Sequence, residues 1–141
     1  MKYLRGLREV EKTLQRKLKH IDTATTEGLV KAGDYLLELS QPLVPVDTGR
    51  LKDSGNVAQN GPNRVFVHYE ARDPVTGYDY APIVHENLAY HHPIHYGGAG
   101  EGHEGRYDCG GQAKFLEQPF RENITELVNI IANNIRKGVD Q

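Results

Sequence analysis

Hydrophobic residues near the start of the chain recur every three or four positions. They occupy Leu4, Leu7, Val10, Leu14, Leu18 and Ile21. This spacing predicts an amphipathic helix, because residues three and four apart share one helical face. The same period continues from Leu29 to Leu39 and stops at Gln41-Pro42, where the proline disfavours further helix. We therefore expect a helical N-terminal region over residues 1–41.

Two glycines interrupt this N-terminal pattern. Gly28 and Gly33 each weaken a helix interior by about 1 kcal/mol relative to Ala. The pattern alone therefore leaves open whether the region is one bent helix or two. Small residues at these positions would also permit close packing of another element.

The middle of the chain changes from the helical period to alternation. Residues 56–59 and 64–70 read as the two strands of a hairpin, with the turn at Asn60-Gly-Pro-Asn63. Tyr80–Glu86 fits either a short strand or a helical turn. Residues 88–112 include seven glycines, and five histidines lie between positions 85 and 103. This composition predicts a long Gly/His-rich loop.

The helical period returns near the C-terminus. Its apolar positions are Phe120, Ile124, Leu127, Val128, Ile131 and Ile135. They predict an amphipathic helix over 117–137, and Pro119 suits its first turn. The expected fold class is thus α+β: N-terminal helices and a C-terminal amphipathic helix packed on a small antiparallel sheet, in a single domain spanning residues 1–141.

Composition narrows the function classes. Hydrophobic residues make up 38% of the chain and the mean hydropathy is -0.62, which predicts a thin core and much surface that stays wet or meets partners. A net charge of -2 argues against a protein that mainly grips nucleic-acid phosphates. Cys109 stands alone, so no intrachain disulfide is expected. No apolar run is long enough to span a membrane, so we expect cytoplasmic assembly without insertion or export.

Asp47-Thr48-Gly49 matches the triad of aspartic proteases, in which two loops bring two carboxylates together. Asp53-Ser54-Gly55 lies too close in sequence to face it across a two-fold axis. A dimeric protease with one loop per chain would have a hydrophobic strand before the triad and a small residue after it, whereas this chain has Pro45 and Arg50. We instead expect Asp47 to be the N-cap of a helical turn over 48–54 that Gly55 closes.

The side chains with metal-ligand chemistry are His85, His91, His92, His95, His103 and Cys109. Their spacing matches no closed zinc finger, and no phosphate-binding loop or nucleophile elbow accompanies them. We therefore expect no enzymatic activity, no catalytic or metal-binding residue and no cofactor. One alternative is a metal-binding enzyme that uses this loop. Another is a small binding or regulatory module.

Three short signatures follow one another in a fixed order: Pro45–Gly55 (PVDTGRLKDSG), Tyr80–Glu86 (YAPIVHE) and Gly111–Pro119 (GQAKFLEQP). Their order and spacing resemble the tailed-bacteriophage neck and tail-completion proteins, the head-tail joining or minor capsid-like family. The matching positions are Pro45, Asp47, Thr48, Gly49, Leu51, Ser54, Tyr80, Ala81, Val84, Glu86, Lys114, Phe115, Leu116 and Pro119.

The resemblance covers nearly the whole chain, and the departures are the loop 88–112 and His85 before Glu86. It implies a structural virion protein, assembled in the host cytoplasm, that forms a sixfold or twelvefold ring at the head-tail junction. The implied partners are copies of itself, head-completion or connector proteins, and tail tube or tail terminator proteins, with passive contact to DNA in the lumen and none to membranes. We expect the loop 88–112 to order on contact with a neighbouring subunit.

Overall fold

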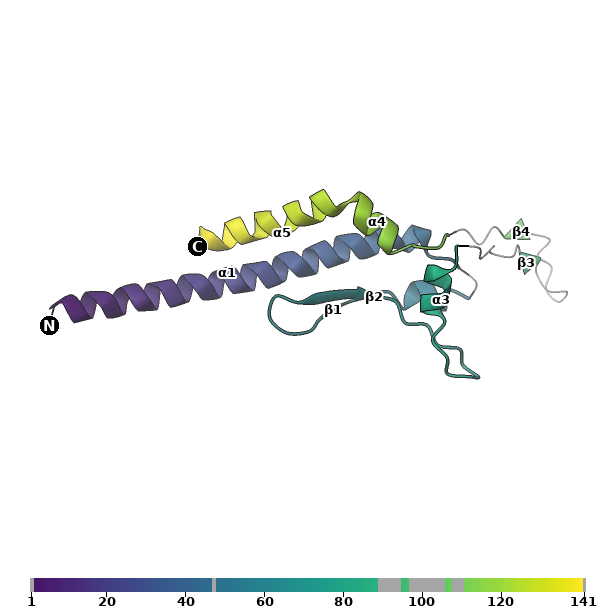
Figure 1. The fold of residues 1–141 in the computed structure, drawn as a ribbon, viewed down its shortest axis with the longest axis horizontal. Coiled ribbons are helices and arrows are strands. Elements are labelled where there is room, and N and C mark those ends of the chain that lie inside the picture. The colour runs from purple at the N-terminus through teal and green to yellow at the C-terminus, as the bar shows by residue number, and fades with distance from the viewer. Residues whose placement is uncertain (1, 47, 89–94, 97–105, 108–110, 141) are drawn as a thin grey trace.

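The computed structural model describes residues 2–46, 48–88, 95–96, 106–107 and 111–140. One helix, α1 (Lys2–Ser40), spans 39 residues and forms the long axis of the molecule (Figure 1). The N-terminal region is therefore a single helix. A short 3-10 helix, η1 (Gln41–Leu43), follows directly and carries Pro42 in its first turn, where the missing N–H does no harm.

The two glycines of α1 lie where other elements approach its backbone most closely. A Cβ atom on Gly28 would lie 3.1 Å from the Cα atom of Ile131 in the C-terminal helix, and one on Gly33 would lie 2.8 Å from Cγ1 of Val57 in the hairpin. The expected close packing at both glycines is confirmed. Tertiary contacts of this kind outweigh the helix-weakening effect of the glycines, because most helical stability in proteins comes from packing.

The predicted hairpin is present. Strands β1 (Asn56–Gln59) and β2 (Val65–His68) pair antiparallel, with Val57 opposite Val67. The turn uses a positive φ at both Gly61 (94°) and Asn63 (53°), residue types that tolerate this conformation. The second strand is shorter than the predicted range 64–70.

Short helices lie on either side of the hairpin in sequence. α3 (Ala81–Glu86) follows it, so the Tyr80–Glu86 segment is helical, whereas α2 (Arg50–Asp53) precedes the hairpin and links it to η1. An isolated antiparallel bridge joins Arg72 and Asp79 at the base of the intervening loop. Within the predicted long loop, β3 (His95–Tyr96) pairs antiparallel with β4 (Arg106–Tyr107).

The predicted C-terminal helix over 117–137 consists of two helices. They are α4 (Glu117–Glu122) and α5 (Ile124–Val139), separated at Asn123, whose φ of -114° and ψ of 15° leave the helical region. Pro119 lies in the first turn of α4, as expected. The backbone N–H of Asn123 donates to the Pro119 carbonyl at 3.1 Å, and the side-chain amide of Asn123 donates to the same carbonyl at 2.9 Å.

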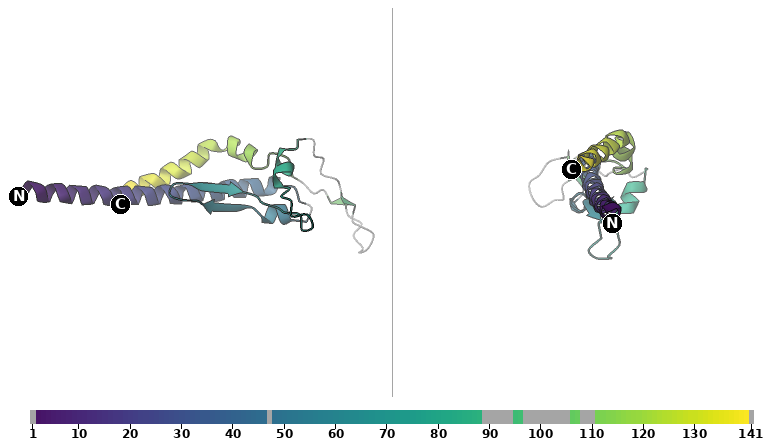
Figure 2. Two further views of the ribbon diagram at one scale, coloured as in Figure 1. Left: turned by 60° about the horizontal axis from the view of Figure 1, so that its bottom comes forward. Right: turned by 90° about the vertical axis from the view of Figure 1, so that its left-hand side faces the viewer.

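The architecture is α+β, with α1 between α5 and the hairpin (Figures 1 and 2). α5 runs antiparallel to α1 along its C-terminal half. A core cluster of Ala32, Leu36 and Leu127 lies between these helices. Asn134 is buried there, and its amide donates to the Ala24 carbonyl at 2.9 Å while its oxygen accepts from Lys31 Nζ at 2.7 Å, so both polar atoms are satisfied.

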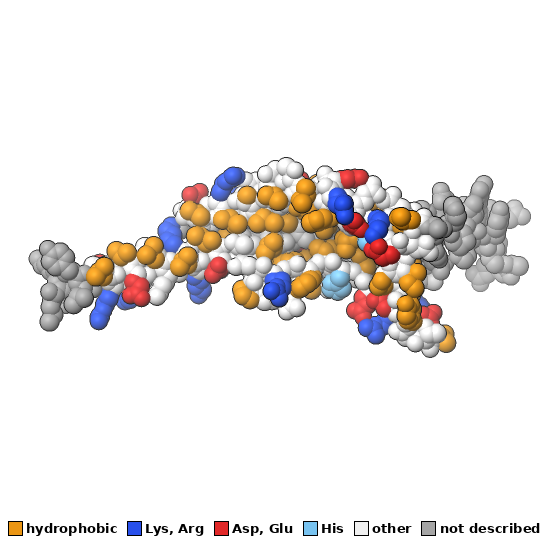
Figure 3. Space-filling view, viewed as in Figure 1, with side chains coloured by type: hydrophobic (Ala, Val, Ile, Leu, Met, Phe, Trp, Pro, Cys, Tyr) orange, Lys and Arg blue, Asp and Glu red, His pale blue; other side chains and the backbone are white. Residues whose placement is uncertain are grey.

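The apolar face predicted for the first half of α1 is not covered by another part of the described chain. Leu7, Val10, Leu14 and Leu18 are each between 56% and 65% exposed. Figure 3 shows hydrophobic side chains along both long helices and onward along this N-terminal segment. Among the described residues, no helix combines the length and the apolar character that crossing a membrane requires.

Candidate functional site

The three sequence signatures meet at one place, where the C-terminal end of α1, α2, α3 and the start of α4 come together. The centre of this junction is Phe115, which is 1% exposed. Its buried cluster is Val44, Leu51, Ala71, Ala81 and Phe115, with Leu43, Tyr69, Tyr80, Val84 and Leu116 packed around it. Each signature therefore contributes at least one buried side chain to the same core, although Leu51 and Phe115 are 64 positions apart in sequence. We call this cluster the signature junction.

Two aromatic rings pack edge-on against Phe115. The ring centroids of Tyr69 and His85 lie 5.2 Å and 4.9 Å from that of Phe115, with interplanar angles of 87° and 89°. Such edge-to-face pairs add about 0.5–1.5 kcal/mol beyond the burial of area. The hydroxyl of Tyr69 reaches the fully buried Ser40 at the end of α1, and burial raises the pKa of Tyr69 above its ordinary value. Phe115 is thus packed between Tyr69, which follows the hairpin and is bonded to α1, and His85 in α3.

The third signature crosses the first at very short range. Gly111 has a φ of 93°, and a Cβ atom there would lie 2.5 Å from the backbone nitrogen of the buried Pro45. Only glycine combines that conformation with this approach. One residue later, the Gln112 N–H donates to the Leu43 carbonyl at 2.9 Å. This backbone pairing positions the start of the third signature against the end of η1.

The first signature forms α2, but with a different cap from the one predicted. Gly49, with a φ of 84°, is the N-cap of α2, so the Asp47 cap over 48–54 was wrong in position. Asp47 itself lies outside the described residues. A left-handed φ costs glycine little, and this allows α2 to start two residues later. The Gly55 N–H donates to the Lys52 carbonyl at 3.3 Å, which closes the turn as expected.

Ser54 links the first signature to the strand that leads into the junction. Its Oγ donates to the Leu51 carbonyl at 2.6 Å and accepts from the Glu70 N–H at 3.2 Å. Thr48 is exposed beside this turn, as is Arg50. The serine therefore has a structural partner on each side.

The second and third signatures are joined by a backbone bond and by charge. The Lys114 N–H donates to the His85 carbonyl at 2.8 Å, and Lys114 adopts a positive φ of 57°. This conformation is uncommon for a residue with a Cβ atom. It turns the Nζ atom of Lys114 between the carboxylates of Glu86 in α3 and Glu117 in α4, the latter at 2.8 Å.

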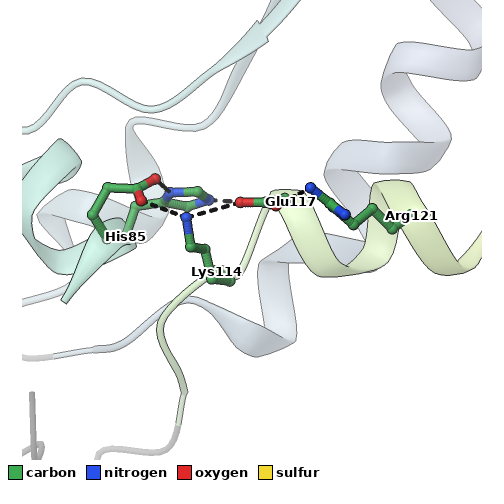
Figure 4. Close-up of polar contacts among 5 residues, drawn as sticks. His85, Lys114, Glu117 and Arg121 are labelled. Atoms are coloured by element: carbon green, nitrogen blue, oxygen red, sulfur yellow. Dashed lines mark hydrogen bonds and ion pairs between the residues drawn. The ribbon is translucent and has the colours of Figure 1, made fainter. Parts of the chain in front are cut away.

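This lysine is the centre of a row of alternating charges (Figure 4). Arg121 pairs with the other oxygen of Glu117 at 2.7 Å, so the row runs from Glu86 through Lys114 and Glu117 to Arg121. Lys114 lowers the pKa of Glu86 and the pKa of Glu117 below their ordinary values, and its hydrogen bond to each carboxylate is the largest cause. The two carboxylates in turn raise the pKa of Lys114, Glu117 being the larger cause. These charges connect α3 to α4 at the surface of the signature junction.

His85 occupies the inner side of this row. Its Nδ1 atom lies 2.7 Å from a carboxylate oxygen of Glu86, and its Nε2 atom accepts from the Glu117 N–H at 3.4 Å. An imidazole that accepts at Nε2 carries its proton on Nδ1, which then donates to Glu86. The ring is therefore bonded at both nitrogens and packed on Phe115. Its role here is to fix the relative position of α3 and α4.

Most of the remaining apolar signature positions belong to the junction, and the two prolines are buried near the ends of the first and third signatures. Pro45, Ala81 and Pro119 are buried, and Tyr80, Val84 and Leu116 are half-buried around Phe115. Sequence reasoning missed the partners that complete the core, above all Tyr69, Ser40 and Ala71. The sequence showed Tyr69 only as an alternating position within the predicted strand 64–70, and nothing in its pattern indicated a bond to the end of α1.

The described residues contain no cluster of side chains suited to bind a metal ion. No group of three or more His, Cys, Asp or Glu side chains is placed there to hold a metal ion. His91, His92, His103 and Cys109 lie outside the described residues, as does most of the loop 88–112. The junction itself offers backbone pairing, aromatic packing and ion pairs, which are contacts that position helices.

Comparison with protein-family models, with curated proteins and with solved structures finds no match to this chain.

Proposed function

We propose that this chain is a structural virion protein of a tailed bacteriophage. It forms a ring in the neck and joins the DNA-filled head to the tail, as a head-tail joining or tail-completion protein. The ring is built from six or twelve copies on the connector, and it is assembled in the host cytoplasm. Its other partners are the head-completion or connector proteins on one side and the tail tube or tail terminator proteins on the other.

The convergence of the three signatures at one junction is the observation that carries this proposal. The signatures were singled out for their resemblance to phage neck proteins, and their apolar members pack into one buried cluster around Phe115. Their polar members bond to backbone groups or to each other, as Ser54 and Lys114 do. Residues arranged in this way hold elements in fixed positions, which is what a subunit of a repeating assembly requires.

The exposure of the long helix supports the same proposal. A monomeric protein rarely leaves a continuous row of large apolar side chains in water, and such rows mark surfaces for other proteins. The row from Leu7 to Leu18 is of this kind. A subunit of a closed ring needs one surface for each of its two neighbours, because cyclic assembly uses heterologous contacts.

The test is to inactivate the gene in a phage that encodes the chain and to examine the lysate by negative-stain electron microscopy. Filled heads beside finished but unattached tails are the expected result, and the wild-type gene supplied in trans restores joined particles. Complete and infectious particles from the inactivated phage would overturn the proposal.

A matched pair of rescue genes tests whether rescue depends on an intact signature junction. Val75→Asp changes a side chain that is 90% exposed in the loop between Arg72 and Asp79, away from the signature junction. It should rescue as well as the wild type. Phe115→Ala, which opens the junction, should fail to rescue.

A further inference from the structure

Two exposed apolar rows lie on different helices of the chain. The first, here called the α1 stripe, consists of Leu7, Val10, Leu14 and Leu18. The second, here called the α4–α5 stripe, consists of Phe120, Ile124 and Val128 and is between 45% and 56% exposed. The α1 stripe has the three- or four-residue spacing of one helical face, and at a rise of 1.5 Å per residue it is about 17 Å long. The residues of the α4–α5 stripe lie on both sides of the break at Asn123, with Phe120 in α4 and Ile124 and Val128 in α5. Both rows consist of large apolar side chains that are exposed.

The α1 stripe continues a face that already binds a helix. Further along α1, Ala24, Gly28 and Ala32 recur every four residues on the face against which α5 packs, and Ala24 comes six residues after Leu18. α5 stops beside Lys17, whose Nζ atom donates to the Val139 carbonyl at 3.1 Å. The stripe is thus the part of the α5-binding face that α5 does not reach, and its chemistry suits a second helix of the same kind.

The charges around the two stripes are complementary. Residues 6–19 of α1 carry five basic and two acidic side chains, whereas residues 117–128 carry three acidic and one basic side chain. Complementary charge of this kind steers encounter and disfavours the wrong partner. An α1 stripe facing the α1 stripe of another copy would bring two basic segments together. An α4–α5 stripe facing its own kind would bring two acidic segments together.

We propose that the α1 stripe of one copy docks on the α4–α5 stripe of a second copy of this chain. The contact is heterologous, so each copy uses one stripe for each of two neighbours, and repetition of the contact closes a ring or extends a filament. This inference rests on the proposed ring assembly and names the surfaces that would build it. Both stripes come from residues outside the signature junction, which leaves the fold of each subunit unchanged on docking.

The test uses the full chain, purified, and measures mass by analytical ultracentrifugation from low to high micromolar concentration. The wild type should self-associate, and more weakly in high salt, because the attraction between the two helices is screened. Leu14→Asp and Val128→Asp each place a charge in one stripe, and each alone should raise the dissociation constant at least about tenfold. Val75→Asp adds the same charge to an exposed apolar side chain outside both stripes and should associate like the wild type.

Mixing the two stripe variants gives the sharper result. A Leu14→Asp copy keeps an intact α4–α5 stripe, and a Val128→Asp copy keeps an intact α1 stripe. Together they should form a two-chain complex that grows no further, although each alone stays monomeric. Circular dichroism of each variant checks that both remain helical. Leu14→Ser and Val128→Ser, which add no charge, repeat the test if an aspartate variant fails that check.

Several results would overturn the docking proposal. They are a wild type that stays monomeric at high micromolar concentration, variants that associate like the wild type, and a mixture that remains monomeric. Association lost only by Leu14→Asp would instead mean that the α1 stripe pairs with itself. These outcomes leave the neck proposal to the gene-inactivation experiment. Conversely, the inactivated phage could give complete particles while the purified chain still associates through the two stripes. That pair of results would overturn the neck role and support the docking proposal.

Discussion

Replacing Phe115 by alanine is the most informative single change to the fold. The side chain is 1% exposed at the centre of the signature junction, and it is held edge-on by Tyr69 and His85. The change removes the ring that all three signatures surround. It therefore tests whether this junction, and not only the packing of α5 on α1, stabilises the molecule.

The expected loss follows from the burial and from the two ring contacts. Truncation of a buried phenylalanine to alanine costs about 3–5 kcal/mol in unfolding free energy, from lost burial and from the cavity left behind. Because domains of this size are stable by about 5–15 kcal/mol, the variant should lose a large part of its total stability. Phe115→Leu keeps most of the apolar volume but loses the two edge contacts, and should cost about 1–2 kcal/mol.

Chemical denaturation followed by far-ultraviolet circular dichroism measures these differences. The matched control is Phe66→Ala, because Phe66 is a phenylalanine of the hairpin that is 47% exposed. This control should lose at most about 1 kcal/mol. A Phe115→Ala variant as stable as Phe66→Ala, with an unchanged denaturant slope, would refute the view that the junction is a core.

Three further predictions concern α5, the glycines of α1 and the surface charges. Leu127→Asp should unfold the domain at a cost of several kcal/mol by burying a charge, whereas Val128→Asp on the exposed side of α5 should stay folded by circular dichroism. Gly33→Ala should lower the melting temperature because its Cβ would lie 2.8 Å from a hairpin valine, whereas Gly6→Ala meets nothing within 4 Å and should raise helix stability by up to about 1 kcal/mol. The pKa of Glu86 is lowered in the folded state relative to its ordinary value of 4.5. The ionised carboxylate therefore stabilises the fold above pH 4.5, and this stabilisation is lost as the pH falls through the folded-state pKa. Glu86→Gln should accordingly reduce the fall in melting temperature below about pH 4.5.

The elements that the sequence predicted are those with a clear local signal. Alternation and the Asn60 to Asn63 turn predicted the hairpin, and the three- and four-residue period predicted the helices at both ends of the chain. The burial of Leu127 on the apolar face of the C-terminal helix is confirmed as well. In each case residues close together in sequence predict the element, and the structure adds only the other element against which it packs.

Other features depend on contacts between distant residues and could not be predicted locally. Helix propensity made Gly28 and Gly33 look like weak points of α1, but the close approach of α5 and the hairpin keeps the helix continuous. The period also could not tell which part of an apolar face would be covered, so the exposure of Leu7 to Leu18 was not foreseen. The break at Asn123 is likewise hidden in an unbroken helical pattern.

In the candidate site, too, the sequence indicated single positions but not the contacts between distant residues. The sequence indicated positions such as Glu86, Lys114 and Phe115 one by one. It did not indicate that an ion pair joins Lys114 to Glu86 or that a ring contact joins Phe115 to His85. Lys114 has a positive φ, which nothing in its residue type suggests. His85 was weighed as a metal ligand and as a departure from the family pattern, whereas its ring packs on Phe115 and bonds to both neighbouring elements.

The central claim, that the chain forms a ring in the neck of a tailed phage, is tested most directly on purified particles. Cryo-electron microscopy focused on the junction between head and tail should show a symmetric ring into which the α1–α5 pair and the hairpin fit once per subunit. Mass spectrometry of the same particles should detect the chain. Particles that are complete and infectious but contain no copy of the chain would contradict the claim.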